Sequence, residues 1–115
     1  MAAIRCAGSG APSLRDAASN LSVVRASTRR AARREALRTC RRALEALPLA
    51  AGGRLGDAAA RDGALAREIH AILRGATEVG APRFFADGGV ALELEVRPTP
   101  AVVARLAPPA PAATR

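Results

Sequence analysis

Arginine is the residue type in this chain whose number and spacing could support binding chemistry. All 18 basic residues are arginine, they outnumber the 10 acidic residues, and the formal net charge is +8. Residues 25–42 contain eight arginines and one glutamate, a balance of +7 that leaves only +1 for the rest of the chain. As a helix, this segment turns five arginines to one side, and these form the candidate basic contact face: Arg30, Arg34, Arg38, Arg41 and Arg42.

Several partners suit such a basic face, and the sequence leaves the choice between them open. Arginines along one helix can contact phosphates, which predicts a small nucleic-acid-binding protein as the alternative function. The chain has no Trp or Tyr to stack on bases, however, and the arginine spacing matches no base-reading motif. The other interpretations are an anionic membrane surface, an acidic protein partner, and a solvated helix face whose arginines reflect only a GC-rich gene.

The residues that could perform catalysis are isolated from one another. The single histidine, His70, has no partner at metal-ligand spacing and is predicted to be a surface or hydrogen-bonded residue. Glu93 and Glu95 share one face of a predicted strand, about 7 Å apart, which is a spacing of interest for glycoside chemistry. A solvated strand face explains them more simply. Residues 8–10 are too short for a phosphate loop. We therefore expect no enzyme, no catalytic residue, no bound metal and no cofactor.

The two cysteines, Cys6 and Cys40, are 34 residues apart in the sequence. One pair in an alanine-rich chain of 115 residues is not a disulfide framework. We interpret both as small apolar residues that fill the core, and the spacing alone does not decide whether they pair.

A long helix must position the arginines. From Leu21 to Leu47 there is no Gly or Pro, strong helix formers dominate, Asn20 suits the N-cap, and Pro48 follows the end. Small residues make up much of its apolar side, which predicts close approach to a sheet or another helix; this side consists of Ala32, Ala36, Leu37, Cys40, Ala43, Leu44 and Leu47. Two further arginines, at positions 29 and 33, point nearer to this apolar side.

A second helix is predicted after a glycine-rich turn at 49–56, which leaves room for a short strand at 54–55. It opens at Asp57 or Asp62, and Gly75 suits the left-handed position just past its end. Its apolar face follows helical spacing and consists of Leu65, Ile69, Ile72 and Leu73.

The strongest local signal is the alternation of apolar and polar residues at 90–97, which predicts a half-buried strand with Glu93, Glu95 and Arg97 on its outer face. Residues 87–89 (Asp-Gly-Gly) predict a turn before it. Residues 77–85 then form the other arm of a hairpin, broken by a glycine at 80 and a proline at 82. A further strand is expected at 3–7, ended by glycines at 8 and 10, and a short helical turn at 101–106.

These elements predict an α+β fold, with a long N-terminal helix and a second helix packed on a small antiparallel sheet in the order β-α-(β)-α-β-β. Residues 1–106 form the single domain, and residues 107–115 form a disordered Pro/Ala tail. Leu, Ile, Val and Phe number only 24 of 115 residues, so the core is thin. The thin core and the exposed sheet edge favour self-association. No apolar run is long enough to cross a membrane.

Four stretches in order resemble the small bacterial lipoprotein family called LPP-twenty and the N-terminal domain of the flagellar H-ring protein. Residues 8–12 (GSGAP) resemble the Gly-x-Gly-x-Pro after that family's first strand, and residues 30–47 resemble its Ala/Arg helix. Residues 68–79 resemble its second helix with the following strand, and residues 84–96 its closing hairpin. Together the stretches span about residues 4–106.

The resemblance implies a dodecin-like fold and a non-enzymatic, envelope-associated structural or interaction role, with a homo-oligomer or an envelope protein as partner. Flavin binding of the dodecin kind is not implied, because there is no Trp to stack on it. Cys6 follows Arg5 rather than a small residue and an apolar stretch, unlike the lipid-accepting cysteine of those lipoproteins. We therefore expect the periplasm or outer membrane if the N-terminus is truncated, and the cytoplasm if the chain is complete.

Overall fold

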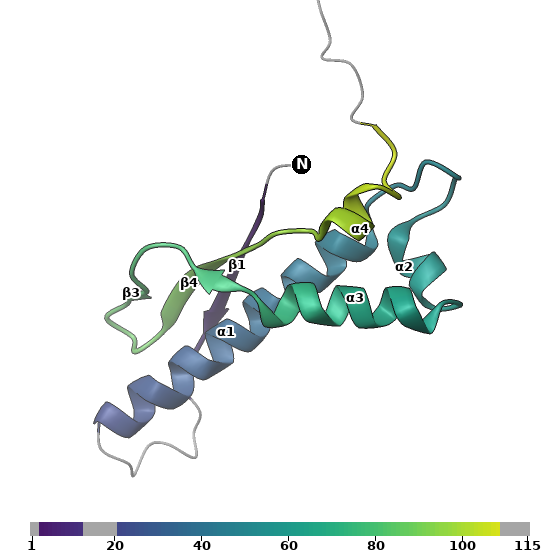
Figure 1. Cartoon of the computed structure of the whole chain (residues 1–115). Coiled ribbons are helices and arrows are strands. Elements are labelled where there is room, and N and C mark those ends of the chain that lie inside the picture. The colour runs from purple at the N-terminus through teal and green to yellow at the C-terminus, as the bar shows by residue number, and fades with distance from the viewer. Residues whose placement is uncertain (1–2, 13–20, 109–115) are drawn as a thin grey trace, which may run out of the picture.

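The computed structural model describes residues 3–12 and 21–108, in which helices pack on a small antiparallel sheet (Figure 1). The predicted α+β class is confirmed. The elements follow one another as β1 (Ile4–Gly10), α1 (Leu21–Glu45), α2 (Leu55–Ala59), α3 (Gly63–Arg74), β2 (Thr77–Glu78), β3 (Arg83–Phe84), β4 (Val90–Val96) and α4 (Pro100–Val103).

The sheet is built around β4, which alternates strictly between buried and half-buried residues, as the sequence pattern predicted. β1 pairs antiparallel with its whole length, from Ile4 opposite Val96 to Gly10 opposite Val90. On the other side β2 and β3 pair with opposite ends of β4. The predicted break between them is confirmed, because Gly80 has a φ of +69° and residues 79–82 leave the strand conformation.

The predicted turn at residues 87–89 is also confirmed. Gly88 has a φ of +87°, a conformation that favours glycine. The carboxylate of Asp87 accepts a hydrogen bond from the Gly89 amide at 2.8 Å, and the Phe85 amide donates to the Gly89 carbonyl at 2.9 Å. The turn therefore closes the hairpin between β3 and β4.

The first strand is longer than the sequence predicted, because Gly8 and Gly10 continue β1 instead of ending it. Helix α1 lies directly over this strand (Figure 1). A Cβ atom at Gly10 would lie 2.6 Å from the Thr28 carbonyl oxygen, and one at Gly8 would lie 2.8 Å from the Ala36 Cα. The two glycines are thus required by the close approach of a helix backbone, which explains why they occur inside a strand.

The buried side of α1 is the predicted one. Ala32, Ala36, Cys40 and Leu44 are fully buried, and they meet the buried side chains of β4 in one apolar core. The helix ends at Glu45, two residues before the predicted end. Beyond it, the Leu47 carbonyl accepts a hydrogen bond from the Leu55 amide at 2.8 Å. The last predicted helical residue therefore belongs to the loop.

The segment between the long helices differs from the prediction. Arg54 forms a single β-bridge with Pro48, but Leu55 begins the short helix α2, so no strand forms at 54–55. Helix α3 is capped by Asp62, one of the two predicted positions, and its predicted apolar face packs into the core. Gly75 ends α3 as expected, but with a φ of −84° rather than a left-handed one.

The end of the domain is tied to the loop after α1. The predicted helical turn at 101–106 is shorter and begins earlier, as α4, because Pro100 suits its first turn and the Thr99 hydroxyl accepts from the Val102 amide. The Ala107 amide donates to the Pro48 carbonyl at 2.9 Å. Most of the predicted Pro/Ala tail (109–115) and the predicted cap Asn20 lie outside the described residues.

Candidate basic site

The five arginines of the basic contact face all lie on α1 and are all exposed. Helical spacing places them on the side of α1 opposite Ala36. The side of α1 that contains Ala36 is covered by the sheet. The helix rises about 1.5 Å per residue, so the face extends for roughly 18 Å between residues 30 and 42.

Acidic neighbours pair with two of these five arginines. Arg38 contacts Glu35 at 3.1 Å and Arg41 contacts Glu45 at 3.6 Å, both within the same helix. Within residues 3–12 and 21–108, no ion pair is formed by the remaining three, which are Arg30, Arg34 and Arg42.

Arg29 and Arg33, which lie nearer to the apolar side of the helix, contact another element of the fold instead. Both contact the carboxylate of Glu78 in β2, at 2.8 and 3.6 Å, and Arg33 also donates to the Ala76 carbonyl at 3.2 Å. These contacts hold the short strand β2 against α1.

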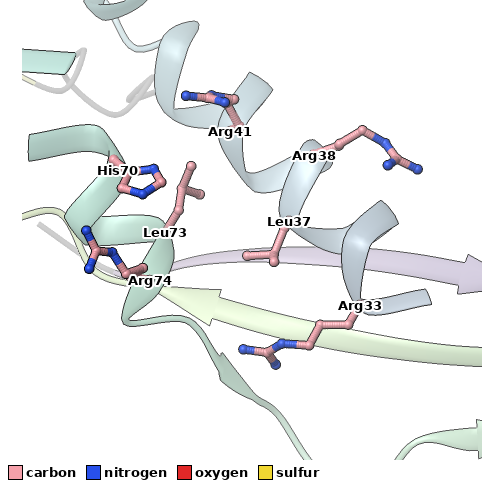
Figure 2. A pocket seen from close by; sticks show the side chains of 7 residues that line it. All are labelled: Arg33, Leu37, Arg38, Arg41, His70, Leu73 and Arg74. Atoms are coloured by element: carbon pink, nitrogen blue, oxygen red, sulfur yellow. The ribbon is translucent and has the colours of Figure 1, made fainter. Parts of the chain in front are cut away.

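A groove of about 400 Å³ lies between α1 and α3 and includes part of the basic face. Its lining contains no acidic residue and consists of Arg33, Leu37, Arg38, Arg41, His70, Leu73 and Arg74. In Figure 2, the two leucines lie between the helices, and the side chains of Arg41, His70 and Arg74 surround them, whereas the Arg38 side chain turns away.

The sequence did not identify the α3 side of this groove. His70 is exposed, which agrees with the predicted surface histidine, and it stands one helical turn before Arg74. The i, i+4 spacing of a histidine and an arginine beside the apolar face was the available signal. It could not be interpreted before the packing of α3 beside Leu37 was known.

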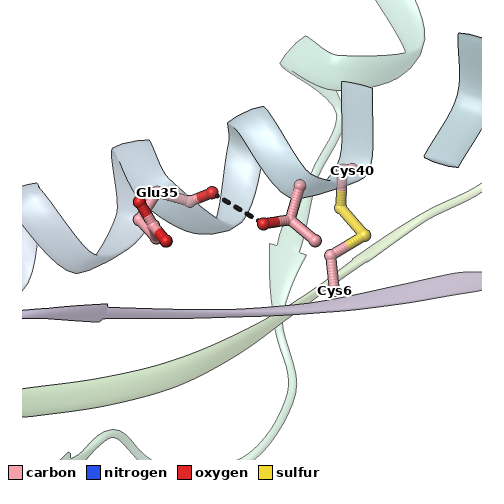
Figure 3. The surroundings of a disulfide bond; sticks show 4 residues. Cys6, Glu35 and Cys40 are labelled. Carbon is pink, nitrogen blue, oxygen red and sulfur yellow. Dashed lines mark hydrogen bonds between the residues drawn. A yellow bond between two sulfur atoms is a disulfide. The ribbon is translucent and has the colours of Figure 1, made fainter. Parts of the chain in front are cut away.

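The two cysteines form a disulfide, which corrects their interpretation as free apolar fillers (Figure 3). Their Cα atoms are 5.3 Å apart, within the range that a disulfide requires. The close packing of α1 on β1 brings them together, since Cys6 is the buried neighbour of Gly8 along the strand. Both cysteines are buried, and no free cysteine remains.

The remaining candidate residues do not form a reactive cluster. Glu93 and Glu95 share the outer face of β4 as predicted, and Glu95 contacts Arg5 and Arg97, each at 3.5 Å. In the described part of the chain, no group of three His, Cys, Asp or Glu residues could hold a metal ion. None of the helices described there is long and apolar enough to cross a membrane.

The fold lowers the pKa of the Asp62 carboxyl group below its ordinary value. Hydrogen bonds from the Leu65 and Ala64 amides lower the pKa of its carboxyl group, Leu65 having the larger effect, and the Arg105 guanidinium contributes in the same direction. Asp62 caps α3 and binds Arg105, so its charge is used to hold the helix rather than to perform chemistry.

Comparisons of the chain with protein-family models, with curated proteins and with solved structures find no match. The structure itself defines an α+β protein with a disulfide, a basic helix face and a cationic groove.

Proposed function

We propose that this chain is a non-enzymatic interaction domain of the bacterial cell envelope that associates with a second copy through the uncovered face of its sheet. We infer the envelope location and the non-enzymatic role from the resemblance of residues 4–106 to the LPP-twenty lipoproteins. The observation that carries the self-association is the open sheet face.

The disulfide supports the envelope location. Disulfides persist in oxidising compartments such as the periplasm and are rare in the reducing cytosol. The bond between Cys6 and Cys40 joins β1 to α1, the two elements with the most extensive packing in the fold. A buried bond at that place suits a protein that folds under oxidising conditions.

The face of the sheet opposite α1 is open in the described part of the chain. Arg5, Ala7 and Ser9 of β1 point to this side and are exposed, and Ala91 of β4 lies beside Ser9. Small residues line the part of the face at Ala7, Ser9 and Ala91, Glu93 of β4 lies beside Ala7 at its centre, and the Arg5–Glu95 ion pair lies at one end. Two such faces can stack at the usual separation of about 10 Å between sheets.

The free edge of β1 is the other candidate for pairing between copies, but α1 blocks it. Neighbouring strands lie about 4.8 Å apart, whereas packed helices need about 8–10 Å between their axes. Because α1 lies directly over β1, antiparallel pairing of two β1 edges would force the two α1 helices into each other. The open face is free of this conflict.

The experiment that tests the proposal compares the mass of the protein in solution with that of an Ala7→Arg variant. We expect a dimer for the unchanged protein at micromolar concentration by sedimentation equilibrium, and a monomer for Ala7→Arg. An Ala66→Arg variant is the matched control, because Ala66 is exposed on α3, away from the sheet. A monomeric unchanged protein, or a dimer that survives Ala7→Arg, contradicts the proposal.

A second candidate function is the binding of nucleic acid through the basic contact face. The observation that favours it is the absence of an acidic partner for Arg30, Arg34 and Arg42 within residues 3–12 and 21–108. Cations that no carboxylate neutralises are available to phosphates, and each phosphate contact releases counterions.

Salt dependence tests this second function directly. The logarithm of the affinity for a DNA duplex should fall linearly with the logarithm of the salt concentration. Replacing Arg30, Arg34 and Arg42 with alanine should reduce the magnitude of that slope by about three, roughly one for each lost phosphate contact. An unchanged slope in the triple variant would rule out phosphate contact through these three arginines.

A further inference from the structure

We propose that the groove between α1 and α3 binds a phosphate monoester that carries a short apolar chain. This inference is independent of the self-association proposed above, because the groove and the open sheet face share no residue. It rests on the charge of the groove, on its apolar floor and on its size.

The cationic lining of the groove favours an anionic ligand. The side chains of Arg74 and His70 form no hydrogen bond or ion pair with any residue in the described part of the chain, and both residues are exposed. Arg41 faces them from α1, and its one ion pair within residues 3–12 and 21–108 is with Glu45, at 3.6 Å. Two guanidinium groups and an imidazole can together donate to the oxygens of one phosphate, which arginine binds in a bidentate manner.

The two leucines of the groove favour a ligand that also carries an apolar group beside the anion. Leu37 and Leu73 are only partly buried, and they lie between the cationic side chains (Figure 2). Half-buried leucines between two packed helices leave some apolar surface that a ligand can remove from water. A bare inorganic phosphate would leave these two side chains uncovered.

The volume of the groove sets the size of the ligand. At about 400 Å³ it falls within the usual range for small-molecule sites, although it is open to solvent on one side. It could hold a phosphate group with a short chain. The chain could belong to a soluble ester or be the first part of a lipid below its phosphate headgroup, and the same groups would recognise both.

The binding experiment uses hexyl phosphate, inorganic phosphate and hexanol as probes and follows the ring protons of His70 by NMR. His70 is the only histidine of the chain, so its signals report on the groove without further assignment. We expect saturable shifts with hexyl phosphate, binding roughly ten-fold tighter than that of inorganic phosphate, and no shift with hexanol.

Two matched variants separate a specific site from general attraction to a basic protein. Arg74→Gln should weaken hexyl phosphate binding about ten-fold or more, as expected for the loss of a charged hydrogen bond. Arg34→Gln removes the same charge from the outward face of α1, which does not line the groove, and should change the affinity less than two-fold. Equal weakening by both variants, or no saturable shift, would overturn the proposal.

A sedimentation assay with vesicles then identifies the source of the ester. Vesicles of phosphatidylcholine with phosphatidic acid are compared with vesicles of phosphatidylcholine alone, for the unchanged protein and for Arg74→Gln. Binding that needs phosphatidic acid and is lost in Arg74→Gln supports a lipid headgroup. Hexyl phosphate binding without such vesicle binding supports a soluble ester.

Discussion

Gly8 lies so close beneath Ala36 that a Cβ atom on the glycine would come within 2.8 Å of the Ala36 Cα. The contact joins the middle of β1 to the middle of α1 through backbone atoms alone. It sets the distance between helix and strand, and this short distance also brings Cys6 within bonding reach of Cys40.

The first prediction concerns this contact. Gly8→Ala should lower the free energy of unfolding by about 3 kcal/mol, because the added methyl group meets the backbone of α1, which cannot move aside as a side chain can. Urea unfolding followed by circular dichroism measures the change. Gly63→Ala is the control, since the space at Gly63 is open apart from the end of the Arg67 side chain, and it should leave stability nearly unchanged.

The second prediction concerns the disulfide. Replacing Cys6 and Cys40 with serine should lower stability by about 4 kcal/mol, because the bond closes a long loop in the unfolded chain. Thermal unfolding with and without dithiothreitol provides the measurement. The unchanged protein should lose stability on reduction, whereas the double variant should be insensitive to the reductant. Equal insensitivity of both proteins would show that the bond does not form.

The third prediction concerns the pH dependence of stability. Because the folded protein lowers the pKa of Asp62 below its ordinary value of 3.8, the unfolded chain binds the proton more readily. The stabilising effect is therefore fully present above that pH and is lost as the pH falls through the lowered pKa. Asp62→Asn retains a capping oxygen but no charge. Its melting temperature should fall less steeply than that of the unchanged protein on acidification below pH 3.8, and parallel curves would contradict this assignment.

The fourth prediction concerns the ion pairs between Glu78 and the arginines at positions 29 and 33. Glu78→Gln should lower the free energy of unfolding by no more than about 1 kcal/mol, since the groups are partly exposed. The difference should shrink in high salt, where charges are screened. Glu93→Gln serves as the comparison, because no ion pair of Glu93 is formed with the described residues.

The sequence predicted the elements whose patterns depend on local chemistry. The period-2 alternation at 90–96, the Asp-Gly-Gly turn at 87–89 and the apolar spacing of α3 all depend on residues close together in the chain. The positions of the five outward arginines followed from helical spacing in the same way.

The features that the sequence did not predict depend on contacts between distant segments. In the sequence alone, Gly8 and Gly10 could equally end a strand or lie inside one. Their place inside β1 becomes clear only from the helix that packs against them. Cys6 and Cys40 could be placed in the core but not paired, because pairing depends on how α1 crosses β1. The groove could not be predicted either, because Leu37 and Leu73 belong to different helices and the sequence does not say how those helices pack against each other.

The disulfide also determines how this domain can respond to mechanical force. Cys6 lies in the first strand and Cys40 in the later part of α1, so a pull applied through the two chain ends passes across the sulfur–sulfur bond. The residues between the two cysteines are bypassed, and their extended length of about 110 Å cannot be drawn out while the bond is intact. A reduced molecule would release that length under tension, and an oxidised one would remain correspondingly shorter.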